Sequence, residues 1–167
     1  HILNTSGISN FPEGQYDMVR LGIGLYGVSN DAEEQKYLEN VSTLKSVISQ
    51  IRTVPAGDSV GYGRRFMAAK PTVVATIPIG YADGISRLWG NGSGYVTVNK
   101  QKAIILGSVC MDMLMVDVTG IDCVEGDDVI VFGESPTVSF IAEQLQTIPY
   151  EILTSISQRV KRVFYRE

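Results

Sequence analysis

The chain contains little histidine and little cysteine. His1 is the only imidazole among 167 residues, so catalysis cannot use an internal histidine dyad. Cys110 and Cys123 form no paired framework and have no metal-ligand spacing, which indicates a reducing compartment and a cytoplasmic location. We therefore predict a chain without a zinc site or another bound metal.

Long apolar runs and an excess of positive charge are also missing. No run approaches the roughly 18 apolar residues of a membrane helix, so we expect no membrane contact. Lys and Arg number 14 against 18 Asp and Glu, and the net charge of −4 repels phosphate backbones. The short basic stretches 64–65 and 159–162 form no large basic face, which disfavours nucleic acid as a partner.

The N-terminal residues 1–5 lack the basic and apolar regions of a signal peptide and a starting methionine, so the sequence looks cut from a longer protein. Its composition, 44% hydrophobic and 19% charged, favours a globular fold over disorder.

The pattern along the chain divides it near residue 40. Residues 16–27 are typical of a strand interrupted by glycines, and residues 30–40 form a polar, acidic linker. Short β segments separated by turn residues follow, which favours an all-β barrel or sandwich. The predicted strands are 44–54, 72–79, 95–98, 103–106, 113–118 and 128–132, two helices are expected at 135–146 and 150–158, and a final strand at 159–165.

The segment from Thr76 to Gly84 is the most informative, because an apolar strand runs into a tyrosine and an aspartate bracketed by glycines. Polar side chains at a strand end are typical of a functional site. Ordinary turn chemistry is the alternative, since Gly80 tolerates positive φ and Asp83-Gly84 suits a tight turn.

Six segments lie in one order along the chain: Asn4-Thr5, Val19–Ile23, Val60–Gly63, Thr76–Gly84, Gly107–Asp112 and Thr147–Glu151. This order and spacing resemble the C-terminal part of alanine racemase, a pyridoxal-phosphate enzyme, over essentially the whole chain. The resemblance implies that residues 1–40 are the tail of a cofactor-binding (β/α)8 barrel. Residues 41–167 would form a mainly β domain, an antiparallel, Greek-key-like barrel with two short helices.

Racemisation requires two bases on opposite faces of a carbanion that the cofactor delocalises. In the resemblance, Tyr62 is the catalytic tyrosine, acting on the L-alanine face. A free phenol has a pKa near 10, so it needs nearby positive charge or hydrogen bonds to act at neutral pH, and Arg64 and Arg65 follow it. The alternative from the residues alone is a strand tyrosine at a β-bulge.

The resemblance also implies a cofactor site. Arg20 would donate to the pyridine nitrogen of the cofactor, whereas an ion pair with Asp17 is the alternative from the residues alone. The backbone amides of Gly22 and Ile23 would hold the phosphate. Thr5, where many members have serine, and Tyr150 would complete that cradle with their hydroxyl groups.

Substrate-binding residues follow from the same resemblance. The backbone amide of Met111 would bind the substrate carboxylate, and Tyr81 and Arg87 would line the substrate entryway. Asp83 is expected to anchor a loop and Asp112 to orient one or pair with a cation. Cys110 is expected to be a small buried hydrophobe, because no base is in sight.

Two departures from the family pattern stand out. Ser108 replaces an arginine that many members carry. The lysine that anchors the cofactor and serves the D face would lie upstream of His1, and the six lysines present do not match its motif: Lys36, Lys45, Lys70, Lys100, Lys102 and Lys161.

The resemblance thus implies part of a homodimeric racemase that interconverts L- and D-alanine for peptidoglycan synthesis, inactive as this portion alone. A non-catalytic structural or dimerisation module and a racemase for serine or another small amino acid are the alternatives.

Overall fold

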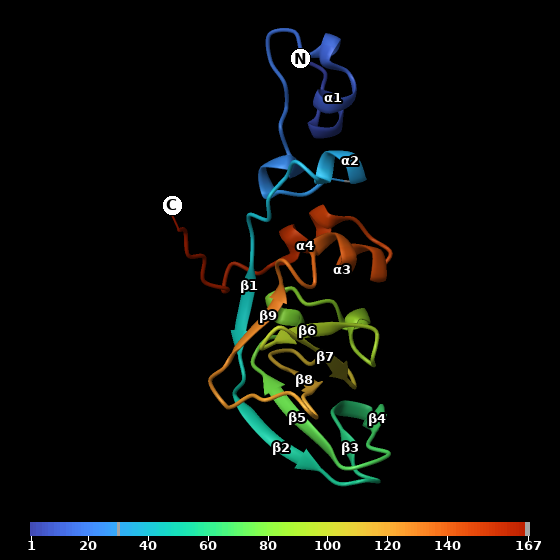
Figure 1. Ribbon diagram of the computed structural model, residues 1–167. Coiled ribbons are helices and arrows are strands. Elements are labelled where there is room, and N and C mark those ends of the chain that lie inside the picture. The colour runs from blue at the N-terminus through green and yellow to red at the C-terminus, as the bar shows by residue number, and fades with distance from the viewer. Residues whose placement is uncertain (30, 166–167) are drawn as a thin grey trace. The chain divides into compact units, whose positions relative to one another are not determined.

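The computed structural model describes residues 1–29 and 31–165, and its ribbon is drawn in Figure 1. The chain forms two compact units, of which the first is His1–Thr43 and the second begins at Leu44. All strands of the described residues belong to the second unit. No helix among these residues is long and apolar enough to cross a membrane.

Short helical turns make up the first unit. They are α1 Thr5–Asn10, the 3-10 turns η1 Pro12–Gly14 and η2 Ile23–Tyr26, and α2 Ala32–Gln35. The Asn4 side chain caps α1 by accepting from the Gly7 amide at 3.0 Å.

The strand predicted over residues 16–27 is wrong. Gly22 has φ −118° and ψ −105°, outside the strand region, and a 3-10 turn follows it. Gly27 ends that turn with φ 71°, and a Cβ atom there would lie 1.7 Å from the Glu39 carbonyl oxygen. Because glycine permits these backbone conformations, the segment from Gly22 to Gly27 forms a turn and not an extended strand.

The second unit is built on antiparallel strands. Its seven-stranded sheet has the order β1-β9-β6-β7-β8-β5-β2, and a separate two-stranded sheet pairs β3 with β4. The strands are β1 Leu44–Val47, β2 Gln50–Val54, β3 Ser59–Val60, β4 Phe66–Met67, β5 Thr72–Ile77, β6 Tyr95–Val98, β7 Gln101–Leu106, β8 Leu114–Asp117 and β9 Asp128–Phe132. The predicted mainly β, antiparallel fold is confirmed.

The sheet curls into a barrel because its two outer strands, β1 and β2, are consecutive in the chain. The single strand predicted at 44–54 bends between Ile48 and Ser49. The Ile48 amide donates to the Asp127 carbonyl beside β9 at 3.0 Å, and the Ser49 amide donates to the Thr76 carbonyl of β5 at 2.9 Å. Two adjacent amides therefore join opposite ends of the sheet.

Strand β5 is buried on both faces, as its continuous apolar run predicted. Ala75 and Ile77 belong to the main core of the barrel. Val74 belongs to a smaller core with Val60 of β3 and Leu106 of β7. This smaller core holds the β3–β4 hairpin against the barrel.

Two helices, α3 Val138–Gln144 and α4 Pro149–Ser155, follow β9. Helix α3 starts later than the helix predicted at 135–146. The Thr137 side chain accepts from the Phe140 amide at 3.1 Å, so Thr137 caps the helix. Helix α4 begins with Pro149, whose missing N–H costs nothing at this position. The helices pack on the barrel through an apolar layer.

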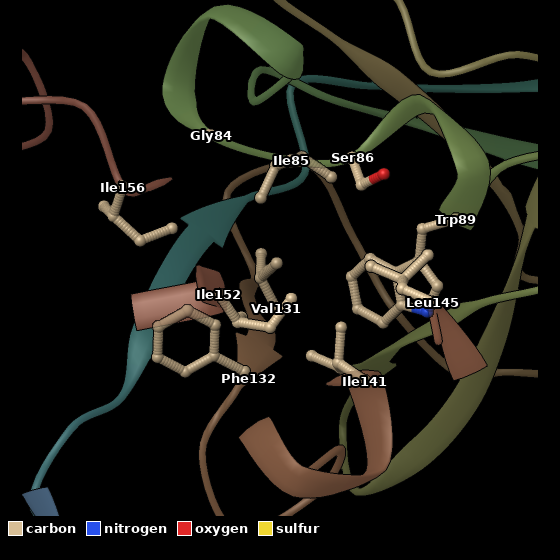
Figure 2. A pocket seen from close by; sticks show the side chains of 10 residues that line it. All are labelled: Gly84, Ile85, Ser86, Trp89, Val131, Phe132, Ile141, Leu145, Ile152 and Ile156. Atoms are coloured by element: carbon tan, nitrogen blue, oxygen red, sulfur yellow. The ribbon is translucent and has the colours of Figure 1, made fainter. Parts of the chain in front are cut away.

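This layer borders a small pocket of about 20 Å³, shown in Figure 2. Side chains of α3 and α4 face Trp89 and the end of β9 across it; the lining residues are Gly84, Ile85, Ser86, Trp89, Val131, Phe132, Ile141, Leu145, Ile152 and Ile156. Trp89 is buried, and no described residue accepts a hydrogen bond from its Nε1.

The strand predicted at 159–165 is wrong. The described residues after α4 form no strand, and the Arg162 guanidinium folds back to donate to the carbonyls of Ile156, Ser157 and Val160. These local hydrogen bonds compete with sheet pairing. Phe164 and Tyr165 are both exposed.

We expect Gly94→Ala to lower the free energy of unfolding by about 1–3 kcal/mol, the usual cost of overpacking. A Cβ atom at Gly94 would lie 2.2 Å from the Trp89 ring. Urea denaturation measures the change. Ser93→Ala, at the exposed neighbour, is the control and should stay within about 0.5 kcal/mol of the unaltered protein; equal effects at both positions would contradict the steric account.

Candidate functional site

In the first unit, three predicted cofactor-binding residues come together. Thr5 is buried at the start of α1, and its Oγ1 accepts a hydrogen bond from the Gly22 amide at 2.8 Å. Ile23 begins η2 directly after Gly22. A Cβ atom at Gly24 would lie 2.9 Å from Thr5 Cγ2, so the glycine lets this turn lie against the threonine.

Arg20 lies beside the same segment. Its amide donates to the Leu3 carbonyl at 2.9 Å, and its Nη2 donates to the Ile2 carbonyl at 3.1 Å. Among residues 1–29 and 31–165, Asp17 forms no ion pair with it. The chain after Arg20 thus runs next to residues 2–5, and the alternative of an Asp17 pair is not realised.

In the second unit, Tyr62 stands in the connection between β3 and β4, in the 3-10 turn η3 Tyr62–Arg64. The flanking glycines, Gly61 at φ 77° and Gly63 at φ 69°, adopt left-handed conformations that other residues rarely take. The ring is 78% exposed, and its hydroxyl bonds to no described residue. The alternative of a tyrosine within a strand is therefore wrong.

The connection that carries Tyr62 folds against the chain between β7 and β8. A Cβ atom at Gly107, which has φ 62°, would lie 2.9 Å from the Val60 carbonyl oxygen. A Cβ atom at Gly61 would lie 3.1 Å from Met115 Cε and 3.9 Å from the Ser108 amide nitrogen. Ser108, where many relatives were expected to carry arginine, is buried at this contact.

Two further loops meet at the end of β5 and the start of β8, which pair with each other. We call residues 80–84 the Tyr81 loop and residues 107–113 the Met111 loop. The Tyr81 amide donates to the Cys110 carbonyl at 2.9 Å, and the Ala82 amide donates to the Met111 carbonyl at 3.0 Å. A Cβ atom at Gly80 would lie 2.3 Å from the Cys110 carbonyl oxygen, so the close approach requires glycine.

The Met111 loop leaves one donor unused. Within residues 1–29 and 31–165, no carbonyl or side chain accepts from the Met111 amide, and the residue is about half exposed. Cys110 is buried, and burial raises the pKa of its thiol although the charge of Arg87 lowers it. It behaves as the buried hydrophobe that the sequence predicted.

Tyr81 and Arg87 also lie close together. The guanidinium carbon of Arg87 lies 5.9 Å from the centroid of the Tyr81 ring, within the range of a cation–π contact. Both residues line a groove of about 400 Å³, whose lining also includes Thr147 and Glu151 of the α4 region. Tyr150 is partly exposed on α4 next to Glu151.

The sequence interpretation missed Arg159, which was placed in a strand. Its Nε donates to Asp83 Oδ1 at 2.7 Å and its Nη2 donates to Asp112 Oδ1 at 2.6 Å. The expected roles of Asp83 as an anchor and of Asp112 as a partner of a cation agree with these contacts. No sequence signal pairs Arg159 with an aspartate 76 residues earlier.

These contacts shift two pKa values. Burial raises the pKa of Asp83, but the hydrogen bonds from Arg159 and from the Gly80 amide and the charge of Arg159 together bring it below its usual value. The hydrogen bonds to Asp83 and Asp112 raise the pKa of Arg159. The described residues contain no group of three or more potential metal ligands.

Comparison with known proteins identifies the class. A family profile described as "Alanine racemase, C-terminal domain" matches residues 41–164, which is most of the second unit. The antiparallel barrel with its exposed phenol and free amide is thus a racemase C-terminal domain. The chain belongs to the alanine racemase family.

The relatives agree along nearly the whole chain. "Alanine racemase 2" of Caldanaerobacter subterraneus subsp. tengcongensis is 43% identical over 171 residues, which cover 98% of this chain and 44% of the relative. The alanine racemase of Desulfosudis oleivorans is 40% identical over 98% of this chain and 44% of its own length. The chain spans less than half the length of these relatives.

Solved structures give the same result. The alanine racemase of Clostridium difficile 630 in complex with cycloserine matches with a TM-score of 0.90 and 38% identity, over 96% of this chain and 44% of that one. The alanine racemase of Bartonella henselae with covalently bound pyridoxal phosphate has a TM-score of 0.90 and 37% identity, over 98% of this chain and 46% of its own.

Because the pKa of Asp83 is lowered in the folded protein, the free energy of unfolding should depend on pH. Its stabilising contribution should be complete above the ordinary carboxyl pKa of about 4 and be lost as the pH falls through the lower value of the folded state. Asp83→Asn should therefore destabilise the protein at neutral pH, by about 1–3 kcal/mol, with a smaller difference near pH 3.

Denaturant unfolding at several pH values measures this difference. Asp58→Asn is the control, because Asp58 is exposed and its side chain contacts no charged group among the described residues. A difference between Asp83→Asn and the unaltered protein that stays constant from pH 7 to pH 3 would contradict the ion-pair account.

Proposed function

We propose that this chain supplies the C-terminal part of a pyridoxal-phosphate-dependent racemase that interconverts L- and D-alanine, with Tyr62 as the base and acid on the L face. The observation that carries the proposal is the position of Tyr62 within a chain of this family. Two left-handed glycines hold its ring outward, and its hydroxyl is available to a substrate. A positioned phenol can accept a Cα proton and return one.

The residues of the first unit fit a phosphate-bearing cofactor. Since Thr5 Oγ1 accepts from the Gly22 amide, its own proton remains to be donated to a phosphate oxygen. The Gly22–Ile23 turn lies directly beside this hydroxyl, and we assign the same phosphate to Tyr150. When bound, pyridoxal phosphate supplies the electron sink that stabilises a Cα carbanion.

Arg20 is assigned to the pyridine nitrogen of that cofactor. A guanidinium remains protonated at neutral pH, so it donates a hydrogen bond without transferring a proton. An arginine in this role keeps the electron sink weak and limits side reactions of the carbanion. In the described residues its Nη2 is held by the Ile2 carbonyl, which fixes the direction of the side chain.

The substrate is assigned to the second unit. The unused Met111 amide can bind a carboxylate, because a backbone N–H donates well to a charged oxygen. Arg87, stacked on Tyr81, places a positive charge in the groove of about 400 Å³ and favours an anionic group approaching through it. We infer a small amino acid as the substrate, with serine as the competing candidate.

We also propose that the intact enzyme is a homodimer located in the cytoplasm, where it provides D-alanine for peptidoglycan. The family resemblance supports the dimer. The two free thiols, Cys110 and Cys123, are compatible with a reducing compartment.

Tyr62→Phe in the full-length protein that contains this chain should lower kcat for racemisation by about 10²–10⁴, the usual contribution of a general base, without loss of cofactor binding. Circular dichroism of D- and L-alanine follows turnover, and the visible absorbance of the cofactor follows binding. Tyr37→Phe, at an 87% exposed tyrosine of the first unit, is the control. Turnover within tenfold of the unaltered enzyme would refute the assignment of Tyr62.

Thr5→Val should weaken pyridoxal phosphate binding by about five- to tenfold, because it removes one hydroxyl donor at nearly constant volume. Thr5→Ser keeps the hydroxyl and should bind within twofold of the unaltered protein. Titration of the apoenzyme with the cofactor, followed by absorbance, gives both dissociation constants. Equal affinities of the Val and Ser variants would remove Thr5 from the proposed cradle.

A further inference from the structure

Arg159 joins two loops that the proposed function uses separately. It follows α4, and its guanidinium, about half exposed, reaches Asp83 with Nε at 2.7 Å and Asp112 with Nη2 at 2.6 Å. Because guanidinium donors have a fixed planar geometry, binding two carboxylates at once fixes the distance between them. Lysine has no such fork.

Asp83 passes this constraint to the Tyr81 loop. Its side chain is mostly buried, and its Oδ2 accepts from the Gly80 amide at 2.8 Å. Its carbonyl accepts from the Ser157 amide at 3.0 Å. Asp83 therefore ties the Tyr81 loop, including Gly80, to the segment that carries Ser157 and Arg159.

The second carboxylate belongs to the Met111 loop. Asp112 directly follows Met111, whose carbonyl accepts from the Ala82 amide at 3.0 Å. The two loops therefore share backbone hydrogen bonds on one side and the Arg159 guanidinium on the other. Removing the guanidinium leaves two carboxylates without their cation and only the backbone bonds to hold the Met111 amide in place.

We propose that Arg159 is a positioning residue for the substrate carboxylate, acting through the two loops that it joins. It touches neither substrate nor cofactor. It holds the Met111 loop against the Tyr81 loop, so that one loop binds the carboxylate while the other lines its path. The inference rests on the proposed function, because the amide and the ring have these roles only in a racemase.

The test uses the full-length enzyme and compares Arg159→Met and Arg159→Lys with the control Arg162→Met. Among the described residues, the Arg162 guanidinium donates only to carbonyls of the chain after α4, so its loss disturbs the same segment without touching either carboxylate. KM and kcat for both alanine enantiomers, the thermal midpoint and the absorbance of bound cofactor are measured for each variant.

We expect Arg159→Met to raise KM for both enantiomers about tenfold with kcat within twofold, since weakening the ground state and the transition state equally changes KM alone. The cofactor absorbance should be unchanged. Arg159→Lys should recover part of the loss, because one ammonium can reach one carboxylate. Arg162→Met should lower the thermal midpoint but leave KM within twofold.

Three results would overturn the inference. These are an unchanged KM in Arg159→Met, an equal rise of KM in Arg162→Met, or a fall of kcat alone. If Arg159→Met does not fold, Asp112→Asn removes one exposed ion pair, and it must raise KM severalfold. If the unaltered full-length enzyme does not racemise alanine, the proposed function itself is refuted. The KM results above refute only the role of Arg159.

Discussion

The second unit depends on the bend at Ile48–Ser49. Because the amides of these adjacent residues bond to opposite ends of one sheet, the sheet has to curl, and its two outer strands become one continuous segment. Ile48 is almost completely buried in the main core, so the same residue closes the barrel and fills it.

Barrel closure decides where the loops lie. β5 ends beside the start of β8, which places the Tyr81 loop against the Met111 loop without any long connection. The β3–β4 hairpin precedes β5 and therefore joins the opposite end of that strand. The smaller core, which includes Val60 and Leu106, packs the hairpin next to Gly107. The position of Tyr62 thus depends on side-chain packing in the smaller core, whereas the positions of the Tyr81 and Met111 loops depend on the pairing of β5 with β8.

The sequence predicted local features better than distant ones. The strand predicted at 95–98 is β6, and it ends where Asn99 and Lys100 take positive φ. The bounds of β9 were also predicted, since a continuous Val/Ile run follows a clear turn. The alternating pattern at 159–165 misled, because charged side chains there bond to carbonyls and to distant aspartates rather than face solvent on a strand. The predicted positions of Tyr62, Thr5 and Met111 rest on spacing shared with the family, and their roles stay predictions.

Trp89 is the only tryptophan of the chain, and it lies between the barrel and the helices α3 and α4. Its indole is buried among aliphatic side chains, and Nε1 has no acceptor among the described residues. Such an environment shifts fluorescence toward the blue, and exposure to water reverses the shift. The indole of this chain therefore reports, by its emission wavelength, whether α3 and α4 are docked on the barrel.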